Sequence, residues 1–308
     1  MGVLEQVARG VLVCPVTGSR LSAQGGHLVT ADGERRFRMV DGVAILLPDA
    51  GAADAYLAEE GGAMASEYRQ ERGVVAVRRR LDGWINRRHT RPPALADALR
   101  QVVWEQDEGA IVLSIGGGPD RWADHITNLN IDRFPNVDVV GDAYALPYAD
   151  GSVDSILCWA VIEHLEFPER AVAEMHRVLK PGGLALLNTP FLQAFHAYPN
   201  HFQNLTVVGQ DRMLERAGFV VKASGAHGAT FALIDLCSVY VRSLLPGRVL
   251  PGLIARILRL LAVITAPLDR RLAQHPNGHV IASNVFSLAE RATRSTAWPA
   301  ATPSRTAR

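Results

Sequence analysis

The chain has 308 residues, of which 48% are hydrophobic and 20% are charged, a composition typical of a folded globular protein. Its 32 Lys and Arg residues nearly balance its 31 Asp and Glu residues, and a net charge of +1 argues against a protein that coats nucleic acid. Three scattered cysteines indicate a reducing compartment without a disulfide framework: Cys14, Cys158 and Cys237. The N-terminus lacks the basic start and apolar core of a signal peptide, so we expect a cytoplasmic protein.

Residues 1–48 are expected to form a small β-rich unit. Residues 12–18 predict a strand that enters a tight turn, and residues 27–30, 36–40 and 43–47 predict three more strands. The spacing resembles that of small zinc-ribbon proteins, in which the turn would read Cys-x-x-Cys. Here Thr17 occupies the second cysteine position and no later Cys pair exists, so we predict a degenerate ribbon without zinc. His27 is interpreted as a strand surface residue.

Residues 49–109 are expected to form a helical linker or cap, with a helix over residues 94–105. Six arginines lie between Arg78 and Arg91 against one acid, with Trp84 among them. Such a cluster is typical of a contact with phosphate, nucleic acid or anionic lipid, and also of a solvated helix face.

The stretch from residue 110 to residue 142 is the one around which the chain is organised. A buried apolar strand is predicted to end at the glycine turn of residues 116–118, followed by a helix that begins near Pro119. Two further short strands end on Asp132 and Asp142. Glycines and acids at the ends of neighbouring strands are what the nucleoside crevice of an open α/β sheet needs. A dinucleotide fingerprint would have a third glycine where Arg121 stands, so an adenosyl ligand without pyrophosphate fits better.

The remaining pattern alternates strands and helices. Strands are predicted at residues 153–160, 184–188 and 219–223, with amphipathic helices at residues 168–179 and around Met213. This alternation predicts an α/β fold with a Rossmann-like, mostly parallel sheet, helices on both faces, and an antiparallel last strand at residues 279–288.

Six short motifs occur in a fixed order over residues 112–191. They read Val-Leu-Ser-Ile-Gly-Gly-Gly-Pro-Asp (112–120), Gly-Asp-Ala (141–143), Leu-Pro-Tyr (146–148), Val-Ile-Glu-His-Leu (161–165), Leu-Lys-Pro-Gly-Gly (179–183) and Asn-Thr-Pro-Phe (188–191). In this order they resemble the class I S-adenosylmethionine-dependent methyltransferases. The resemblance implies a methyltransferase domain over residues 110–290, with S-adenosylmethionine as its cofactor.

The same resemblance implies roles for individual residues. Gly116 and Gly118 would lie under the methionine part of the cofactor, Asp132 would hold the ribose, and Asp142 with Ala143 would meet the adenine.

Three more residues are candidates on the cofactor side: Ser114, Trp159 and His164. Ser114 stands where the family often has an acid, and Asp120 where it often has a third glycine.

Candidate catalytic residues lie in the loop after the fifth strand of this domain. His201 is the first candidate for a base and His196 the second, because imidazole titrates near neutrality. The sulfonium is already a reactive electrophile, so holding acceptor, methyl and sulfur in line is the main task, and no metal is required. A base is needed only for a hydroxyl or an acidic carbon acceptor.

A long helical insertion is predicted at residues 226–277, before the last strand. Apolar residues recur at helical spacing over residues 249–272, but Arg256 and Arg259 interrupt them, so we expect no membrane-spanning helix. The insertion is interpreted as a lid or a homodimer surface first, and as a peripheral membrane contact second. Residues 291–308 are expected to be a disordered tail.

These observations favour a methyltransferase that acts on a small molecule or a glycan. Two alternatives remain: a non-catalytic scaffold that has kept the fold, suggested by Ser114 and Asp120, and a tRNA methyltransferase, suggested by the ribbon and the arginine cluster. The fourth strand ends on Cys158-Trp-Ala-Val161 and not on an Asn-Pro-Pro-Tyr type signature, which argues against nucleic acid as the acceptor.

Overall fold

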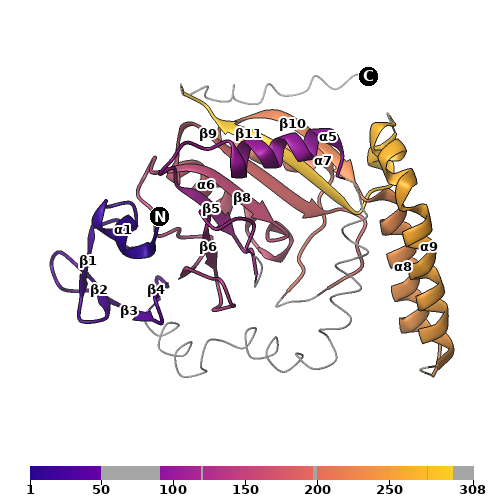
Figure 1. The fold of residues 1–308 in the computed structure, drawn as a ribbon, viewed down its shortest axis with the longest axis horizontal. Helices are drawn as coiled ribbons and strands as arrows, with labels where there is room; N and C mark the ends of the chain where they lie inside the picture. The colour runs from indigo at the N-terminus through magenta and orange to yellow at the C-terminus, as the bar shows by residue number, and fades with distance from the viewer. Residues whose placement is uncertain (50–90, 119–120, 197–199, 248, 276, 294–308) are drawn as a thin grey trace, which may run out of the picture.

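The computed structural model describes residues 1–49, 91–118, 121–196, 200–247, 249–275 and 277–293. Within these residues the strands form one eleven-stranded sheet in the order β1-β2-β3-β4-β7-β6-β5-β8-β9-β11-β10 (Figure 1).

The middle of the sheet is parallel. Its strands are β5 (Val112–Ile115), β6 (Thr127–Asn130), β7 (Val139–Gly141), β8 (Val153–Trp159) and β9 (Leu179–Pro190). Two antiparallel strands complete one side, β10 (Phe219–His227) and β11 (Asn284–Arg291), and β11 lies between β9 and β10. The predicted α/β fold with a mostly parallel sheet is therefore confirmed.

The N-terminal unit continues this sheet on its other side. It contains α1 (Val3–Ala8), β1 (Leu21–Gln24), β2 (His27–Thr30), β3 (Arg36–Val40) and β4 (Val43–Leu46). β1 to β4 form an antiparallel meander, and β4 then pairs in parallel with β7, with Ile45 opposite Val140. Residues 12–18 differ from the prediction: they contribute only isolated bridges, from Leu12 to Tyr148 and from Val13 to Arg20.

Helices cover both faces of the sheet, as predicted. On one face α5 (Pro93–Leu99) continues as one π-helical stretch, η1 (Arg100–Trp104), and packs on apolar side chains of β5, β8 and β9. On the other face lie α6 (Pro168–Val178) and α7 (Val207–Arg216). The apolar residues of α6 recur every three or four positions, so they fall on one side of the helix and are buried together: Ala171, Val172, Met175 and Val178.

The connections between β5, β6 and β7 are short. Residues 116–126 join β5 to β6, and residues 121–126 of this connection form turns and bends where a helix was predicted. Pro119 and Asp120, the predicted helix start, lie outside the described residues. Arg121 stabilises the turn, because its guanidinium donates to the carbonyl of Ile126 and pairs with Asp138 at 2.8 Å. The prediction of a full helix here was wrong because a crossover of this length leaves little room for one.

The predicted insertion is a helical hairpin. α8 (Ala229–Leu244) and α9 (Val249–Gln274) lie side by side, at the opposite end of the molecule from the N-terminal strands (Figure 1). A short 3₁₀ turn, η3 (Gly278–Val280), precedes β11, which begins at Asn284 and so later than predicted. None of the helices among the described residues combines the length and the apolar character needed to span a bilayer.

Two sequence predictions lie outside the described residues. They are the arginine cluster between Arg78 and Arg88, and the tail from residue 294 onward.

Candidate functional site

The candidate site lies at the carboxyl edge of the parallel strands. β7, β6, β5 and β8 are neighbours in the sheet and all run in parallel, so their carboxyl ends share one edge. Gly116 directly follows β5, Asp132 follows β6, and Asp142 directly follows β7. The topology therefore places the predicted glycine turn and both predicted acids on the rim where open α/β sheets bind nucleosides.

The glycine turn has the backbone conformation that glycine favours. Gly116 has φ +71° and Gly118 has φ +59°. A Cβ on Gly116 would lie 2.1 Å from Cγ2 of Val161, so this position is closed by the chain itself. A Cβ on Gly118 would meet nothing within 4 Å, which leaves its side of the turn open for a ligand to approach.

The two acids are held in place by backbone amides. Asp132 is only 4% exposed, and its carboxylate accepts a hydrogen bond from the amide of Arg133 at 2.7 Å. Asp142 is partly buried, and its carboxylate accepts from the amide of Tyr144 at 2.8 Å. Each of these contacts fixes one oxygen of the carboxylate and so helps to set the orientation of the side chain.

Three other predicted cofactor residues have different environments. Ser114 is buried within β5, and its hydroxyl has no hydrogen-bond partner among the described residues. Ala143 is 9% exposed next to Asp142. Trp159 ends β8 and packs against Trp122, with ring centroids 5.0 Å apart, so it contributes an aromatic wall near the rim.

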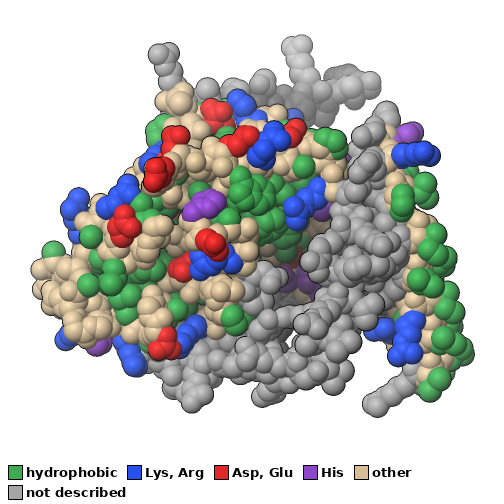
Figure 2. All heavy atoms as spheres, viewed as in Figure 1, with side chains coloured by type: hydrophobic (Ala, Val, Ile, Leu, Met, Phe, Trp, Pro, Cys, Tyr) green, Lys and Arg blue, Asp and Glu red, His purple; other side chains and the backbone are tan. Residues whose placement is uncertain are grey.

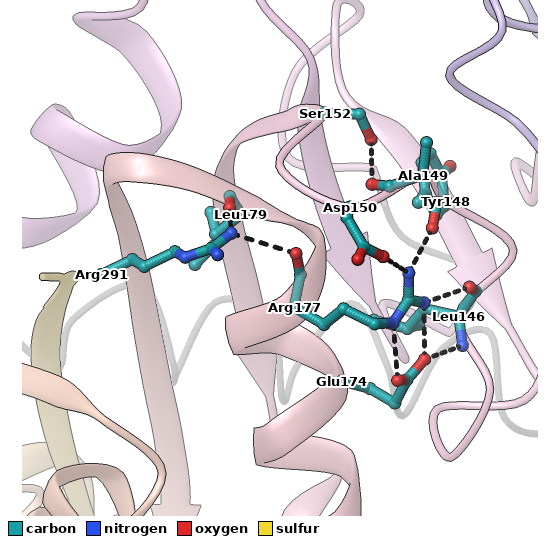
Figure 3. A network of polar contacts seen from close by, with 9 residues as sticks. All are labelled: Leu146, Tyr148, Ala149, Asp150, Ser152, Glu174, Arg177, Leu179 and Arg291. Carbon is teal, nitrogen blue, oxygen red and sulfur yellow. Dashed lines mark hydrogen bonds and ion pairs between the residues drawn. The ribbon is translucent and has the colours of Figure 1, made fainter. Parts of the chain in front are cut away.

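A polar network supports the loop that follows Asp142 (Figure 3). The Arg177 guanidinium, from α6, donates to the carbonyls of Leu146 and Tyr148 and pairs with Asp150 at 2.7 Å. It also pairs with Glu174 at 2.7 Å, and that carboxylate accepts from the amide of Leu146. The pKa of Arg177 is raised by these carboxylates, chiefly Glu174. The network ties the loop after β7 to α6, a helix of the core.

A cavity of about 320 Å³ borders this loop. It is lined by the N-terminal turn, Tyr144, Leu146 and the Arg177 network. Its lining contains none of Gly116, Gly118, Asp132 and Asp142, so it is not the strand-end site.

A cluster of histidines and one acid lies after β8 and β9. Glu163 and His164 belong to a 3₁₀ turn, η2 (Ile162–His164), and His196 and His201 come from the loop after β9. The ring centroids of His164 and His196 are 5.4 Å apart, and those of His196 and His201 are 4.3 Å apart. The structure thus brings both predicted catalytic histidines together with His164.

Glu163 is the unusual member of the cluster. It is 1% exposed, and neither carboxylate oxygen has a hydrogen-bond partner among the described residues. Burial raises the pKa of Glu163 to about 7. Burial also lowers the pKa of His164, although the carbonyl of Asn200, 2.5 Å from its Nδ1, opposes this effect.

The hydrogen bonds of the other two histidines set their roles. Nδ1 of His201 accepts from the amide of His196 at 3.2 Å, and its Nε2 lies 2.7 Å from Oδ1 of Asn204. His196 has its Nδ1 3.0 Å from the carbonyl of Ala194, and one of its ring nitrogens lies within 4.8 Å of ligand atoms of Glu163 and His164. His201 is therefore engaged through both ring nitrogens, whereas His196 has one nitrogen for chemistry.

Residues 120–187 match the family described as Methyltransferase domain. The chain therefore contains a methyltransferase domain. The matched segment begins after Gly118 and ends in β9, so it includes Asp132 and Asp142 but not the glycines of residues 116–118.

Curated bacterial proteins resemble about a third of the chain. A probable S-adenosylmethionine-dependent methyltransferase of Mycolicibacterium smegmatis is 38% identical over 112 residues, which cover 33% of this chain and 44% of that protein. An uncharacterized methyltransferase of Mycobacterium sp. (strain KMS) is 38% identical over 111 residues, covering 30% and 44%. The chain spans less than half the length of these relatives.

Solved structures resemble the domain more distantly. An S-adenosylmethionine dependent methyltransferase from Mesorhizobium loti is 16% identical with a TM-score of 0.39, covering 64% of this chain and 98% of that one. A phosphoethanolamine N-methyltransferase of Haemonchus contortus, in complex with S-adenosyl-L-methionine, is 15% identical with a TM-score of 0.40, covering 68% and 55%. Neither bears on what this chain acts upon.

Sequence reasoning named Glu163 only as part of a motif and missed its isolation. The signal was present: an adjacent Glu-His pair follows one strand, and two histidines follow the next strand of the sheet. What the sequence could not reveal is that the carboxylate is buried without a partner.

Proposed function

We propose that this chain is an S-adenosylmethionine-dependent methyltransferase that acts on a small molecule or a glycan. The observation that carries the proposal is the convergence of Gly118, Asp132 and Asp142 on one edge of the parallel sheet. The methyl-donor side of such a site would face the loop of His196 and His201, which follows β9.

The acceptor would gain reactivity mainly from orientation. Holding the acceptor atom in line with methyl and sulfur supplies roughly 7 to 11 kcal/mol of the barrier. For a hydroxyl acceptor, one imidazole of the histidine cluster would take the proton as the oxygen–methyl bond forms and the carbon–sulfur bond breaks. The products are the methylated acceptor and S-adenosylhomocysteine.

The test uses S-adenosylmethionine labelled in its methyl group, incubated with fractionated bacterial extract and the full chain. Label in the small-molecule or glycan fraction is expected, and it should fall at least tenfold with Asp132→Ala. Asp124→Ala, an exposed acid in the same stretch, is the matched control and should keep the rate. Label confined to an RNase-sensitive fraction would favour tRNA. Absence of S-adenosylmethionine binding would favour a scaffold that has kept the fold but lost the cofactor.

We also propose that the N-terminal unit is a zinc-ribbon-like fold that binds no zinc. Cys14 is 1% exposed, and Thr17 is hydrogen-bonded to Ser19 with 2.7 Å between their hydroxyl oxygens. The unit would serve as an extension of the sheet through the β4–β7 pairing. Cys14→Ser should leave the zinc content of the purified protein unchanged, and a loss of bound zinc in this variant would contradict the proposal.

A further inference from the structure

A second kind of site is visible in the cluster around Glu163. One ligand atom each from Glu163, His164 and His196 lies within 4.8 Å of the others. Nε2 of His164 is 3.8 Å from Oε1 of Glu163. In a tetrahedral site with bonds of 2.0–2.2 Å, ligand atoms are about 3.4 Å apart, so small side-chain rotations would close this set on one ion.

The tautomers of both imidazoles suit metal ligation. Nδ1 of His164 faces the carbonyl of Asn200 at 2.5 Å, and Nδ1 of His196 faces the carbonyl of Ala194 at 3.0 Å. A carbonyl oxygen can only accept, so each Nδ1 carries the proton and each Nε2 keeps a lone pair. Metal-binding histidines are oriented in the same way, with the second nitrogen donating to a carbonyl or carboxylate.

The buried carboxylate of Glu163 gives an independent reason to expect a bound cation. A buried carboxyl group without a hydrogen bond is costly, and both oxygens of Glu163 are in this state among the described residues. A cation bound beside it would compensate the buried charge. Two imidazole nitrogens and one carboxylate oxygen are the ligand set of catalytic zinc sites that keep one position open.

We propose that Glu163, His164 and His196 bind a divalent transition-metal ion, of the class of Zn²⁺, at the acceptor side of the methyltransferase site. Three protein ligands would leave one coordination position for an oxygen or nitrogen of the acceptor. His201 is a positioning residue here, because it accepts from the amide of His196 and so holds that loop.

The test is a calorimetric titration of the full, EDTA-treated chain with ZnCl₂, repeated with CoCl₂ while the visible absorption of bound Co²⁺ is recorded. One ion should bind per chain, with an affinity in the micromolar range or tighter. Glu163→Gln, His164→Ala and His196→Ala should each weaken binding at least tenfold. His27→Ala and Cys14→Ser, in the N-terminal unit, are the controls and should bind as the unchanged chain does.

Three outcomes would overturn the proposal. They are the absence of binding, full binding by the His196→Ala chain, and loss of binding in the N-terminal controls. His196 lies in a loop, so its variant tests the proposal even if Glu163→Gln alters folding. Methyl transfer does not enter the measurement, so its result is independent of the proposed function.

A different observation concerns the outer face of α9. Apolar side chains on this face are exposed: Val249 86%, Leu250 61%, Leu253 52%, Ile257 51%, Leu260 61% and Ile264 65%. The opposite side of the helix, with Pro251 and Ala255, is buried. At 100° per residue the exposed residues form one continuous stripe. Figure 2 shows apolar and basic side chains along the outer side of the hairpin.

The charge of the hairpin decides between its candidate partners. Residues 229–274 contain six arginines and two aspartates and no lysine or glutamate, a net charge of +4. A second copy of the chain would bring two positively charged hairpins together, and the repulsion between them would oppose a dimer. An anionic lipid surface offers both an apolar layer and opposite charge.

We infer that the stripe on α9 binds the surface of an anionic membrane, with the helix lying in the interface. The test is sedimentation of the full chain with vesicles of phosphatidylcholine alone or with 30% phosphatidylglycerol, about 30% being the anionic share that gives a clear surface potential. Binding to the anionic vesicles is expected, and it should weaken as salt rises. Ile257→Asn with Ile264→Asn should reduce binding at least tenfold. Val208→Asn, on α7 and 68% exposed, is the matched control.

Equal binding by the Ile257→Asn/Ile264→Asn chain and the unchanged chain would overturn the inference. So would a stable dimer in analytical ultracentrifugation that the same two substitutions dissociate, because the stripe would then be covered by a second copy.

Discussion

Two helices of this chain, α6 and α9, are both amphipathic, but their apolar faces have opposite exposure to solvent. The apolar side of α6 is buried against the sheet, with Met175 and Val178 fully covered. The apolar stripe of α9 faces outward, with Ile264 65% exposed. Periodicity alone indicates that a face is apolar, whereas the position of a helix relative to the sheet decides whether the chain itself covers that face.

The largest expected difference between the two helices is in stability. Met175→Ala should lower the free energy of unfolding by about 2 to 5 kcal/mol, because it leaves a cavity in a close-packed core. Ile264→Ala should change it by no more than about 0.5 kcal/mol, since its side chain is in solvent. Urea denaturation of the three chains measures both values. Equal losses would mean that the stripe on α9 is already covered in the folded protein.

The next effect concerns catalysis at the rim. His201→Ala should leave cofactor affinity nearly unchanged and reduce turnover on the order of a hundredfold, because the loop that carries His196 would be displaced. Turnover is measured with the true acceptor, and cofactor affinity is measured separately by calorimetry with S-adenosylhomocysteine. An unchanged rate would remove His201 from the mechanism.

The sequence predicted well the strands of the parallel sheet and the helix α6 that packs on it. The apolar runs that became β5, β8 and β9, and the spacing that became α6, are local patterns with a single outcome in a buried parallel sheet. The missed features depend on distant partners. Nothing local indicates that β4 pairs with β7, or that Arg121 pairs with Asp138.

The candidate site divides in the same way. The glycines and the two acids could be found because each directly follows a strand, and strand order then places them on one edge. The isolation of Glu163 could not be found, because it depends on which side chains of other segments fail to reach it.

A smaller effect is expected for the ribose contact. Asp132→Ala should weaken S-adenosylhomocysteine binding by roughly 1.5 to 3 kcal/mol, the range for hydrogen bonds to a charged group. Calorimetry with Asp124→Ala as control measures this directly. Equal affinity for the Asp132→Ala and unchanged chains would mean that the ribose lies elsewhere.

The smallest expected effect is a dependence of stability on pH through His176, a partly buried residue of α6. Burial lowers the pKa of His176, whose ring packs edge-on against Phe219 at 5.1 Å. As the pH is lowered, His176 therefore becomes protonated at a higher pH in the unfolded chain than in the folded chain. The free energy of unfolding should decrease as the pH drops below about 6.5. His176→Gln, which cannot be protonated, should flatten this slope in urea denaturation at pH 5 to 8. A slope identical to that of the unchanged chain would contradict the assignment.

The central claim is that Gly118, Asp132 and Asp142 form one adenosyl site on the rim of the sheet. Calorimetric titration of the full chain with S-adenosylhomocysteine tests it most directly. The account predicts that one molecule binds per chain and that adenosine competes for the same site. A titration that shows no binding of S-adenosylhomocysteine by the folded protein would contradict it.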